Sequence, residues 1–439
     1  CERGQGRAMH RADGIQTPAK HTQARLHRSD GPLADNRCIA PHRAIAVDRA
    51  TSIELSCNPA RAMNLRRFLF SVEGAPYVLV PFIPLAVVLE LVHADPVIVF
   101  FASALGVIPT AALMGRATEE LAERSGPGIG GLLNVTFGNA PELIIALFAL
   151  NAGLHEVVKA SIIGSIMGNA LLVLGAAAFV GGLRRERQRF DATAAVTQSS
   201  MLLLAGVALV MPAVFELVEG VGLPQPDAER INYDATVENL SYAVAVVLIG
   251  TYIAGLVFSL KTHRDLFNPV AQTDDDPDPI QHGDAEPWTV RKSVLMLAIA
   301  GMAVGLMSEI LVGSITEASE TVGLSEFFIG VIVVAIVGNA AEHWVAVLVA
   351  WKDKMDLAVN IAIGSAAQIA LFVAPVLVLC SLFIGPHPMA LVFNGFEIAG
   401  VLMAILIAAH VTNEGETTWF EGLQLLAVYA VLGIAFFFA

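Results

Sequence analysis

Long apolar stretches, interrupted by short charged runs, dominate the chain after Met63. The apolar residues are continuous rather than alternating, and most stretches approach the roughly 20 residues that an α-helix needs to cross a bilayer. This pattern predicts an all-α, polytopic membrane protein with eleven transmembrane helices. The expected segments are 76–93, 96–115, 130–153, 160–182, 195–216, 240–260, 292–313, 325–350, 357–384, 388–410 and 421–438.

The composition supports this fold class. Of 439 residues, 55% are hydrophobic and 15% are charged, whereas soluble domains carry about 25% charged residues. Residues 1–62 differ, because they are basic and contain no long apolar run. We interpret them as a basic tail that is either disordered or a start-site artefact. The four cysteines have no spacing typical of a disulfide framework or a zinc site.

The distribution of positive charges predicts an orientation. After residue 62, fourteen Arg and Lys residues fall in the N-terminal flank and in every second loop, and only Lys159 and Arg230 fall in the alternate loops. Positive residues gather on the cytoplasmic side of membrane proteins. We therefore expect a cytoplasmic N-terminus and a C-terminus outside, in a bacterial inner (plasma) membrane. The net charge of -14 is attributed to acidic loops, including those at 216–238 and 317–326.

An acidic, proline-containing stretch divides the chain. Residues 261–291 include the sequence TDDDPD at 273–278, and this composition is typical of a solvated linker. We expect it to lie in the cytoplasm between two five-helix units, 96–260 and 292–439. A first transmembrane helix within residues 63–95 precedes them.

Two short motifs recur in one register. The sequence GNAPE at 138–142 returns as GNAAE at 338–342, so that the two glutamates are 342 - 142 = 200 residues apart. The dipeptide Gly-Ser at 164–165 returns at 364–365, again after 200 residues. The third predicted helix leaves the cytoplasm and the eighth returns to it, so the units are predicted to be inverted repeats. Such repeats are common in secondary transporters, which bind their substrate near the midplane between the repeats.

Glu142 and Glu342 are the residues on which the functional hypothesis depends. Each lies within an apolar run that has no Lys or Arg in its core. An ionised carboxylate at the bilayer centre costs about 2.5–3.5 kcal/mol on insertion scales, so a cation or a proton must offset that cost. Two carboxylates neutralise one divalent ion, and burial and mutual repulsion favour protonation when the ion leaves. The pair is therefore predicted to hold either one Ca²⁺ or about two protons.

The neighbouring residues suit a hard cation. Carboxylate, amide and carbonyl oxygens are preferred calcium ligands, and glycine and proline in the motifs are expected to weaken the helix and free carbonyls. The candidate site comprises Glu142, Glu342, Asn139, Asn339, Gly138, Gly338, Ser165, Asn169, Ser365, Gln368 and His343.

Structural interpretations of the same residues stay open. The asparagines could join helices by hydrogen bonds, and the glycines at 164 and 364 could serve close packing rather than ion binding. An intramembrane glutamate can also be a structural hydrogen-bonding residue. His343 could be a ligand, a proton carrier or a neighbour of the path, and the sequence does not distinguish these roles.

These motifs resemble the calcium/proton exchanger (CAX) family of the calcium/cation antiporter superfamily. The resemblance rests on GNAPELI at 138–144, GNAAEH at 338–343, ATEEL at 117–121, FSLKTH at 258–263 and residues 415–438. It implies eleven helices, with one extra helix followed by two inverted five-helix bundles. It also implies that Glu142 and Glu342 form the ion- and proton-binding pair.

The resulting hypothesis is a secondary active transporter, not an enzyme, that exchanges Ca²⁺ for H⁺ by alternating access. Ca²⁺ is then a transported substrate and H⁺ the counter-ion. The rivals are a Na⁺- or K⁺-coupled exchanger of the same fold, a membrane-embedded enzyme and a passive cation channel. The expected partners are the lipid bilayer and these ions, and not nucleic acid, while a homo-oligomer is compatible with the sequence.

Overall fold

The computed structural model describes residues 74–226, 230, 232–262 and 288–439. The tail 1–62 and nearly all of the linker 261–291 lie outside these residues. The regular secondary structure of these residues is helical, apart from the two-residue strands β1 (Gln188–Arg189) and β2 (Glu416–Thr417), which pair antiparallel.

The helices fall into two series on either side of the linker. The first series consists of η1 (Ala75–Leu79), α2 (Phe82–Leu91), α3 (Pro96–Gly138), α4 (Ala140–Asn151), α5 (His155–Met167), η2 (Gly168–Val173), α6 (Leu174–Gly182), α7 (Ala192–Val218), α8 (Ala235–Val257) and η3 (Phe258–Thr262). The second series consists of α10 (Val290–Val322), α11 (Glu326–Phe328), η5 (Ile329–Val334), α12 (Ala335–Trp351), α13 (Met355–Gln368), η6 (Ile369–Val373), α14 (Ala374–Cys380), α15 (Gly395–Val411), η7 (Thr412–Glu414) and α16 (Trp419–Phe437).

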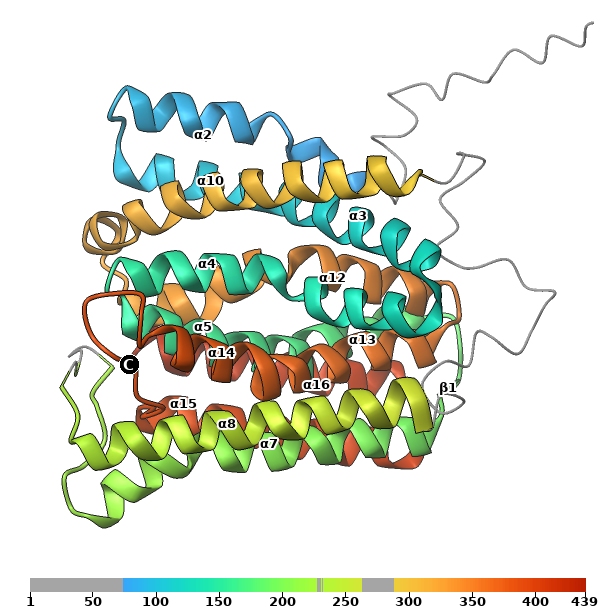
Figure 1. Ribbon diagram of the computed structural model, residues 1–439. Helices are drawn as coiled ribbons and strands as arrows, with labels where there is room; N and C mark the ends of the chain where they lie inside the picture. Colours follow the sequence, from blue (N-terminus) through green and yellow to red (C-terminus); the bar gives the residue numbers. More distant parts are fainter. Residues whose placement is uncertain (1–73, 227–229, 231, 263–287) are drawn as a thin grey trace, which may run out of the picture. The chain divides into compact units, whose positions relative to one another are not determined.

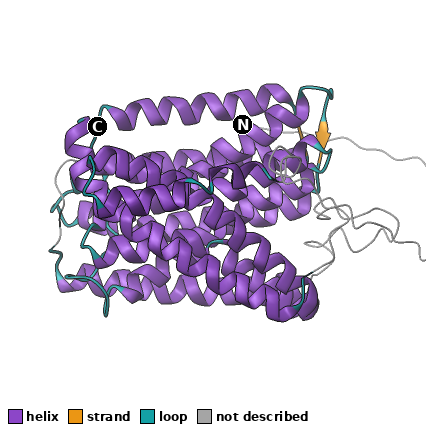
Figure 2. Ribbon diagram, turned by 90° about the horizontal axis from the view of Figure 1, so that it is seen from above, coloured by secondary structure: helices purple, strands orange, loops and turns teal. Residues whose placement is uncertain are grey.

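The helices of residues 74–439 run lengthwise beside one another in both views (Figures 1 and 2). Helices α2, α3 and α10 pack together along one edge, and α7, α8 and α15 lie along the opposite edge (Figure 1). Between them, α5 packs against η5 and α12, and α4 packs against α12. The two motif-bearing segments thus lie at the centre, surrounded by other helices.

The helical, polytopic membrane fold is confirmed. Among the described residues, nine helices are long and apolar enough to cross a membrane, and a tenth results if the bent pair Leu132–Gly138 and Ala140–Asn151 is one span. The first apolar segment forms only the shorter helix Ala75–Leu91. The count of eleven and the inverted layout stay predictions.

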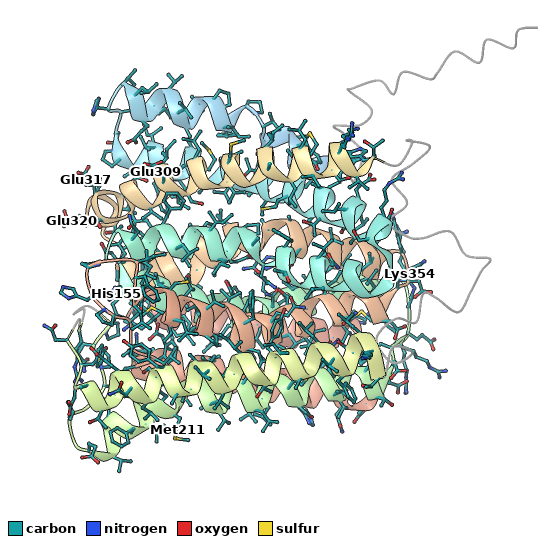
Figure 3. The ribbon with its side chains drawn as sticks, viewed as in Figure 1. His155, Met211, Glu309, Glu317, Glu320 and Lys354 are labelled. Carbon is teal, nitrogen blue, oxygen red and sulfur yellow. The ribbon has the colours of Figure 1, made fainter. Side chains whose placement is uncertain are left out.

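Several predicted boundaries are wrong. Residues 116–129 are not a loop but continue α3, because ATEELAER at 117–124 consists largely of good helix formers. Glu317 and Glu320, assigned to an acidic loop, lie on the last turns of α10. Figure 3 places both at the opposite end of the helices from Lys354.

The tenth apolar segment also begins later than predicted. Residues 388–394 are not helical, although Met389 through Phe393 are fully buried. The sequence GPHP at 385–388 explains the difference, because each proline lacks a backbone donor and disfavours helix in the residue before it. Helix α15 starts only after Asn394, which forms a capping box with Glu397.

Loops that the charge pattern assigned to one membrane face meet at one end of the bundle. Strand β1 follows α6 and pairs with β2, which follows α15. Arg185 Nε lies 2.8 Å from Asp353 Oδ1 in the turn after α12, and Arg187 pairs with Glu416. Three of the loops assigned to that face thus lie together, whereas the full alternation of loops and the identity of the cytoplasmic end stay predictions.

Candidate ion-exchange site

Glu142 lies in the first turn of α4, directly after a break in the helix. The chain bends by 42° between Leu132–Gly138 and Ala140–Asn151, and Asn139 has φ -95° and ψ 17° at the break. Pro141 at the start of α4 fits there, because the first turn of a helix needs no proline N–H. The expectation that the first motif interrupts its helix is confirmed.

Glu342 lies in the interior of α12, and its motif does not interrupt the helix. Helix α12 continues from Ala335 through Gly338 to Trp351, so the expected weakening of the helix at Gly338 does not interrupt it. Without a proline, one glycine costs a helix only about 1 kcal/mol. The irregular part of this span is instead the π-helix η5, which is followed directly by α12.

Each glutamate lies against the motif glycine of the other half of the chain. A Cβ atom added to Gly338 would lie 3.2 Å from Cγ of Glu142. A Cβ atom added to Gly138 would lie 3.4 Å from Oε1 of Glu342. The two carboxylates also interact electrostatically. The structure therefore brings both motifs together, and it does so reciprocally.

A hydrogen-bond network joins the motif asparagines to the Gly-Ser segments of the opposite halves. Ser365 Oγ lies 3.0 Å from Asn139 Oδ1, and Asn139 Nδ2 donates to Gln368 Oε1 at 2.7 Å. In the same way Asn339 Nδ2 donates to Ser165 Oγ at 2.9 Å. These five side chains come from four spans, and the sequence had proposed all of them as site residues.

Three further contacts complete the network. Asn169 Nδ2 lies 3.3 Å from both Asn339 Oδ1 and Ser365 Oγ. Ser365 Oγ also lies 2.8 Å from Glu342 Oε2. The hydroxyl of Ser365 therefore connects the glutamate of the second motif to the asparagine of the first.

Three buried oxygens of the site lack donors within the described part of the chain. They are both carboxylate oxygens of Glu142 and Oδ1 of Asn169. Buried acceptors without a donor cost free energy, more so when they are charged. Oxygens in this condition can accept a cation, and the carboxylate can alternatively accept a proton.

Comparison with known protein families shows to which family this chain belongs. The family model described as sodium/calcium exchanger protein matches residues 96–261 and 292–438. The chain belongs to this exchanger family. The two matched stretches flank the linker, and each contains one copy of the glutamate motif.

Two relatives of this chain are Ca(2+)/H(+) antiporters. The chain is 45% identical over 358 residues to the Ca(2+)/H(+) antiporter ChaA of Bacillus subtilis, covering 81% of this chain and 96% of that protein. It is 44% identical over 371 residues to a Ca(2+)/H(+) antiporter of Synechocystis sp., covering 82% and 96%. The resemblance to calcium/proton exchangers is confirmed.

Solved structures agree with the fold of the exchanger. The structure of native YfkE has 41% sequence identity, a TM-score of 0.69, and coverage of 83% of this chain and 100% of that chain. The crystal structure of the H+/Ca2+ exchanger CAX, at 15% identity, has a TM-score of 0.60 and covers 84% and 92%. The exchanger is therefore an integral, multi-pass membrane protein with this fold.

The candidate His343, and the glycines Gly164 and Gly364, are next to network residues in the sequence but do not join the network by a described hydrogen bond. Nε2 of His343 is buried and has no hydrogen-bond partner among the described residues. A Cβ atom added to Gly164 would lie 2.0 Å from the carbonyl oxygen of Val331. A Cβ atom added to Gly364 would have no described neighbour closer than 3.6 Å. Gly164 is thus a close-packing glycine, and Gly364 is not.

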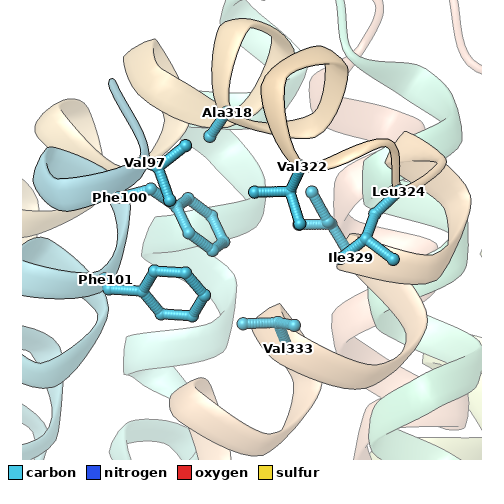
Figure 4. A pocket seen from close by; sticks show the side chains of 8 residues that line it. All are labelled: Val97, Phe100, Phe101, Ala318, Val322, Leu324, Ile329 and Val333. Atoms are coloured by element: carbon cyan, nitrogen blue, oxygen red, sulfur yellow. The ribbon is translucent and has the colours of Figure 1, made fainter. Parts of the chain in front are cut away.

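An apolar cavity of the exchanger is separate from the network. It lies between the start of α3, the end of α10 and η5 (Figure 4). All of its lining residues are apolar: Val97, Phe100, Phe101, Ala318, Val322, Leu324, Ile329 and Val333. Without a polar atom on its side chains, this cavity does not suit an ion.

Sequence reasoning missed a second buried ionisable cluster in the exchanger. Glu156, Lys159 and Glu397 are nearly inaccessible to solvent. The sequence contained a signal for this cluster. Glu397 is the only Asp, Glu, Lys or Arg within the apolar segment 388–410. After residue 62, Lys159 is one of two cations outside the N-terminal flank and the loops that carry the other positive charges.

Proposed function

We propose that the protein exchanges Ca²⁺ for H⁺ across a membrane at a site formed by Glu142 and Glu342. The observation that carries this proposal is the buried Glu142 carboxylate, neither oxygen of which accepts a hydrogen bond from another described residue. Such a group is stable in the membrane with a bound cation or a proton. The related antiporters named above act on the same two ions.

The ligand set supports a hard divalent cation. Glu142 and Glu342 supply two negative charges, and Asn169 supplies a neutral oxygen without a donor. Calcium prefers such a mixture of carboxylate and neutral oxygens. Two carboxylates balance the charge of one Ca²⁺, so the occupied site is neutral within the bilayer.

The contacts of Ser365 support proton binding at the second glutamate. Its hydroxyl has a single hydrogen but lies within hydrogen-bond distance of two acceptors, Asn139 Oδ1 and Glu342 Oε2. With the amide of Asn139 oriented as in the structure, one of these contacts needs another hydrogen. A proton on Glu342 would provide it, because the acid then donates to Ser365 and Ser365 donates to Asn139.

Ca²⁺ and protons compete for the same carboxylates, and this competition couples their fluxes. The site takes Ca²⁺ in one access state and is reopened on the other side, where protons displace the ion. An empty site with two charges crosses poorly because neither charge is offset. Alternating access of the two repeats then produces exchange.

Calcium flux into proteoliposomes under an imposed pH gradient tests the proposal. The wild-type protein is expected to move Ca²⁺ against protons, and Glu142→Gln and Glu342→Gln each to abolish that flux while staying folded. Glu416→Gln is the control, because Glu416 pairs with Arg187 at the end of the bundle. Wild-type flux in either site variant would refute the assignment.

The same vesicles separate the rival functions. A Na⁺ or K⁺ gradient that drives Ca²⁺ flux without a pH gradient indicates coupling to that ion instead. Ca²⁺ movement without any accompanying proton movement indicates a passive channel. Both results would overturn exchange for protons.

A further inference from the structure

Lys159 is a fully buried cation in the same continuous span, His155–Gly182, as two residues of the proposed site, Ser165 on α5 and Asn169 on η2. Its side chain is 1% exposed and pairs with Glu156 one turn earlier on α5. Its Nζ also lies 3.2 Å from the carbonyl oxygen of Val392 and 5.9 Å from the centre of the Tyr233 ring. The ammonium group thus connects α5 to the buried segment before α15 and to the loop before α8.

The carboxylates around Lys159 outnumber it. Glu397 is completely buried and interacts electrostatically with both Glu156 and Lys159. One oxygen of Glu397 accepts from the backbone N–H of Asn394 at 2.8 Å. The other, like Oε2 of Glu156, has no donor in the described part of the chain. Removing the cation would leave two buried carboxylates without an opposite charge.

A second ion pair completes the cluster from the loop side. Arg230 Nη1 lies 3.0 Å from Glu216 Oε2, and its guanidinium lies 4.7 Å from the centre of the Tyr233 ring. Lys159 and Arg230 are the two cations that violated the predicted charge asymmetry, and both are paired with buried carboxylates. Neither is therefore a free loop charge.

Helix α5 leads from this cluster directly into the ion site. Ser165 and Asn169 follow Lys159 by six and ten residues, which is about 9 Å and 15 Å along a helix. Between Lys159 and Ser165, helix α5 packs closely on η5, since a Cβ atom on Gly164 would lie only 2.0 Å from the carbonyl oxygen of Val331. Close packing sets the distance between two helices, whereas a directional ionic contact also sets their register.

The equivalent helix of the second half lacks this contact. In the 200-residue register Lys159 corresponds to Val359, and Glu156 corresponds to Asp356. Asp356 Oδ1 accepts a hydrogen bond of 2.5 Å from the backbone N–H of Asp191 at an exposed position. A buried cation is thus present in the N-terminal part of α5 and absent from the N-terminal part of α13.

We propose that Lys159 is a positioning residue, which ties α5 to the segment before α15 and so holds Ser165 and Asn169 in place for Ca²⁺. The described contacts of Lys159 are to Glu156, Val392 and Tyr233, and not to Glu142 or Glu342. This inference rests on the proposed function for its ligand, Ca²⁺. Loss of a group that hydrogen-bonds a metal ligand typically lowers metal affinity by about 10–100-fold, and Lys159, which acts on the ligands through the helix, is expected at the lower end of that range.

Equilibrium Ca²⁺ binding to purified protein in detergent, without a pH gradient, tests this role. Lys159→Met is expected to melt at a lower temperature, because it leaves Glu156 and Glu397 uncompensated, and to raise the Ca²⁺ Kd at least about tenfold. The double variant Glu156→Gln/Lys159→Met removes the carboxylate charge of Glu156 together with the ammonium charge of Lys159. We expect it to regain part of the lost thermal stability, because only Glu397 is then left uncompensated. It should keep the raised Kd, since the contact with Val392 is still missing.

Two measurements separate positioning from a merely structural role. In vesicles the double variant should show a raised Ca²⁺ KM with a maximal rate per folded protein within about twofold of wild type. Arg230→Gln is the matched control, because it removes a neighbouring cation whose described contacts are to Glu216, Tyr233 and Gly222 and not to α5, and its Kd should be unchanged. Lys159→Gln is the second variant if the double variant does not fold.

The outcomes are distinct. A wild-type Kd in a folded variant that lacks Lys159, or an equal rise of Kd in Arg230→Gln, would overturn the positioning role. If the wild-type protein binds Ca²⁺ but shows no proton-driven flux, the proposed exchange fails while the Kd comparison still decides the role of Lys159. If the wild-type protein binds no Ca²⁺, both proposals fall.

Discussion

The Gly-Ser segments of the two halves should respond oppositely to the same substitution. In Gly164→Ala the new methyl group would lie 2.0 Å from the carbonyl oxygen of Val331, where an ordinary contact begins at 3.4 Å. Helix α5 and η5 must therefore separate by about 3.4 - 2.0 = 1.4 Å. The obstacle is backbone, so no side-chain rotation relieves it.

The expected magnitude follows from this geometry. Overpacking a dense interior costs about 1–3 kcal/mol, and a clash with fixed backbone belongs at the upper end of that range. Gly364→Ala meets no atom closer than 3.6 Å, and replacing a helical glycine by alanine stabilises by up to about 1 kcal/mol. The two variants should thus differ by about 4 kcal/mol, although they occupy equivalent positions of the repeat.

Thermal melting of both variants in detergent, followed by tryptophan fluorescence, measures the difference. Gly164→Ala should melt well below wild type and lose Ca²⁺ flux, because Ser165 moves with its helix. Gly364→Ala should melt at or above the wild-type temperature. Equal melting temperatures would show that α5 and η5 are not in backbone contact and would refute the reasoning.

Two smaller changes test other contacts. Gly338→Ala should keep the protein folded but weaken Ca²⁺ binding several-fold in an equilibrium titration, since its Cβ would lie 3.2 Å from Cγ of Glu142; an unchanged Kd would contradict the proposed role of that carboxylate. Burial raises the pKa of Tyr233 above its ordinary value of 10, so the folded state favours the neutral phenol and loses stability as the pH rises through the raised pKa. Tyr233→Phe should therefore show a smaller fall in melting temperature above pH 10 than wild type, and an identical fall would contradict it.

The recurrence of one motif after 200 residues was sufficient to select the site candidates. Glutamate and asparagine are costly in an apolar run, so a matched pair of GNA-x-E motifs indicated function before any coordinates. Seven of the predicted polar residues take part in one network: Asn139, Asn339, Ser165, Ser365, Gln368, Asn169 and Glu342. His343 had no equivalent in the first motif, and the structure does not connect it to the network by a described hydrogen bond.

Sequence alone was sufficient to predict the membrane class and the family and to propose the central pair, because insertion into a bilayer depends on the local sum of about 20 residues. The tertiary structure decided which partners meet. Asn139 reaches Gln368 across 229 positions, and Lys159 meets Val392 across 233. No local pattern encodes such contacts, since they depend on how separate helices pack. For the same reason only the fold distinguishes Gly164 from Gly364: identical dipeptides become different sites when one helix lies against a neighbouring backbone and the other does not.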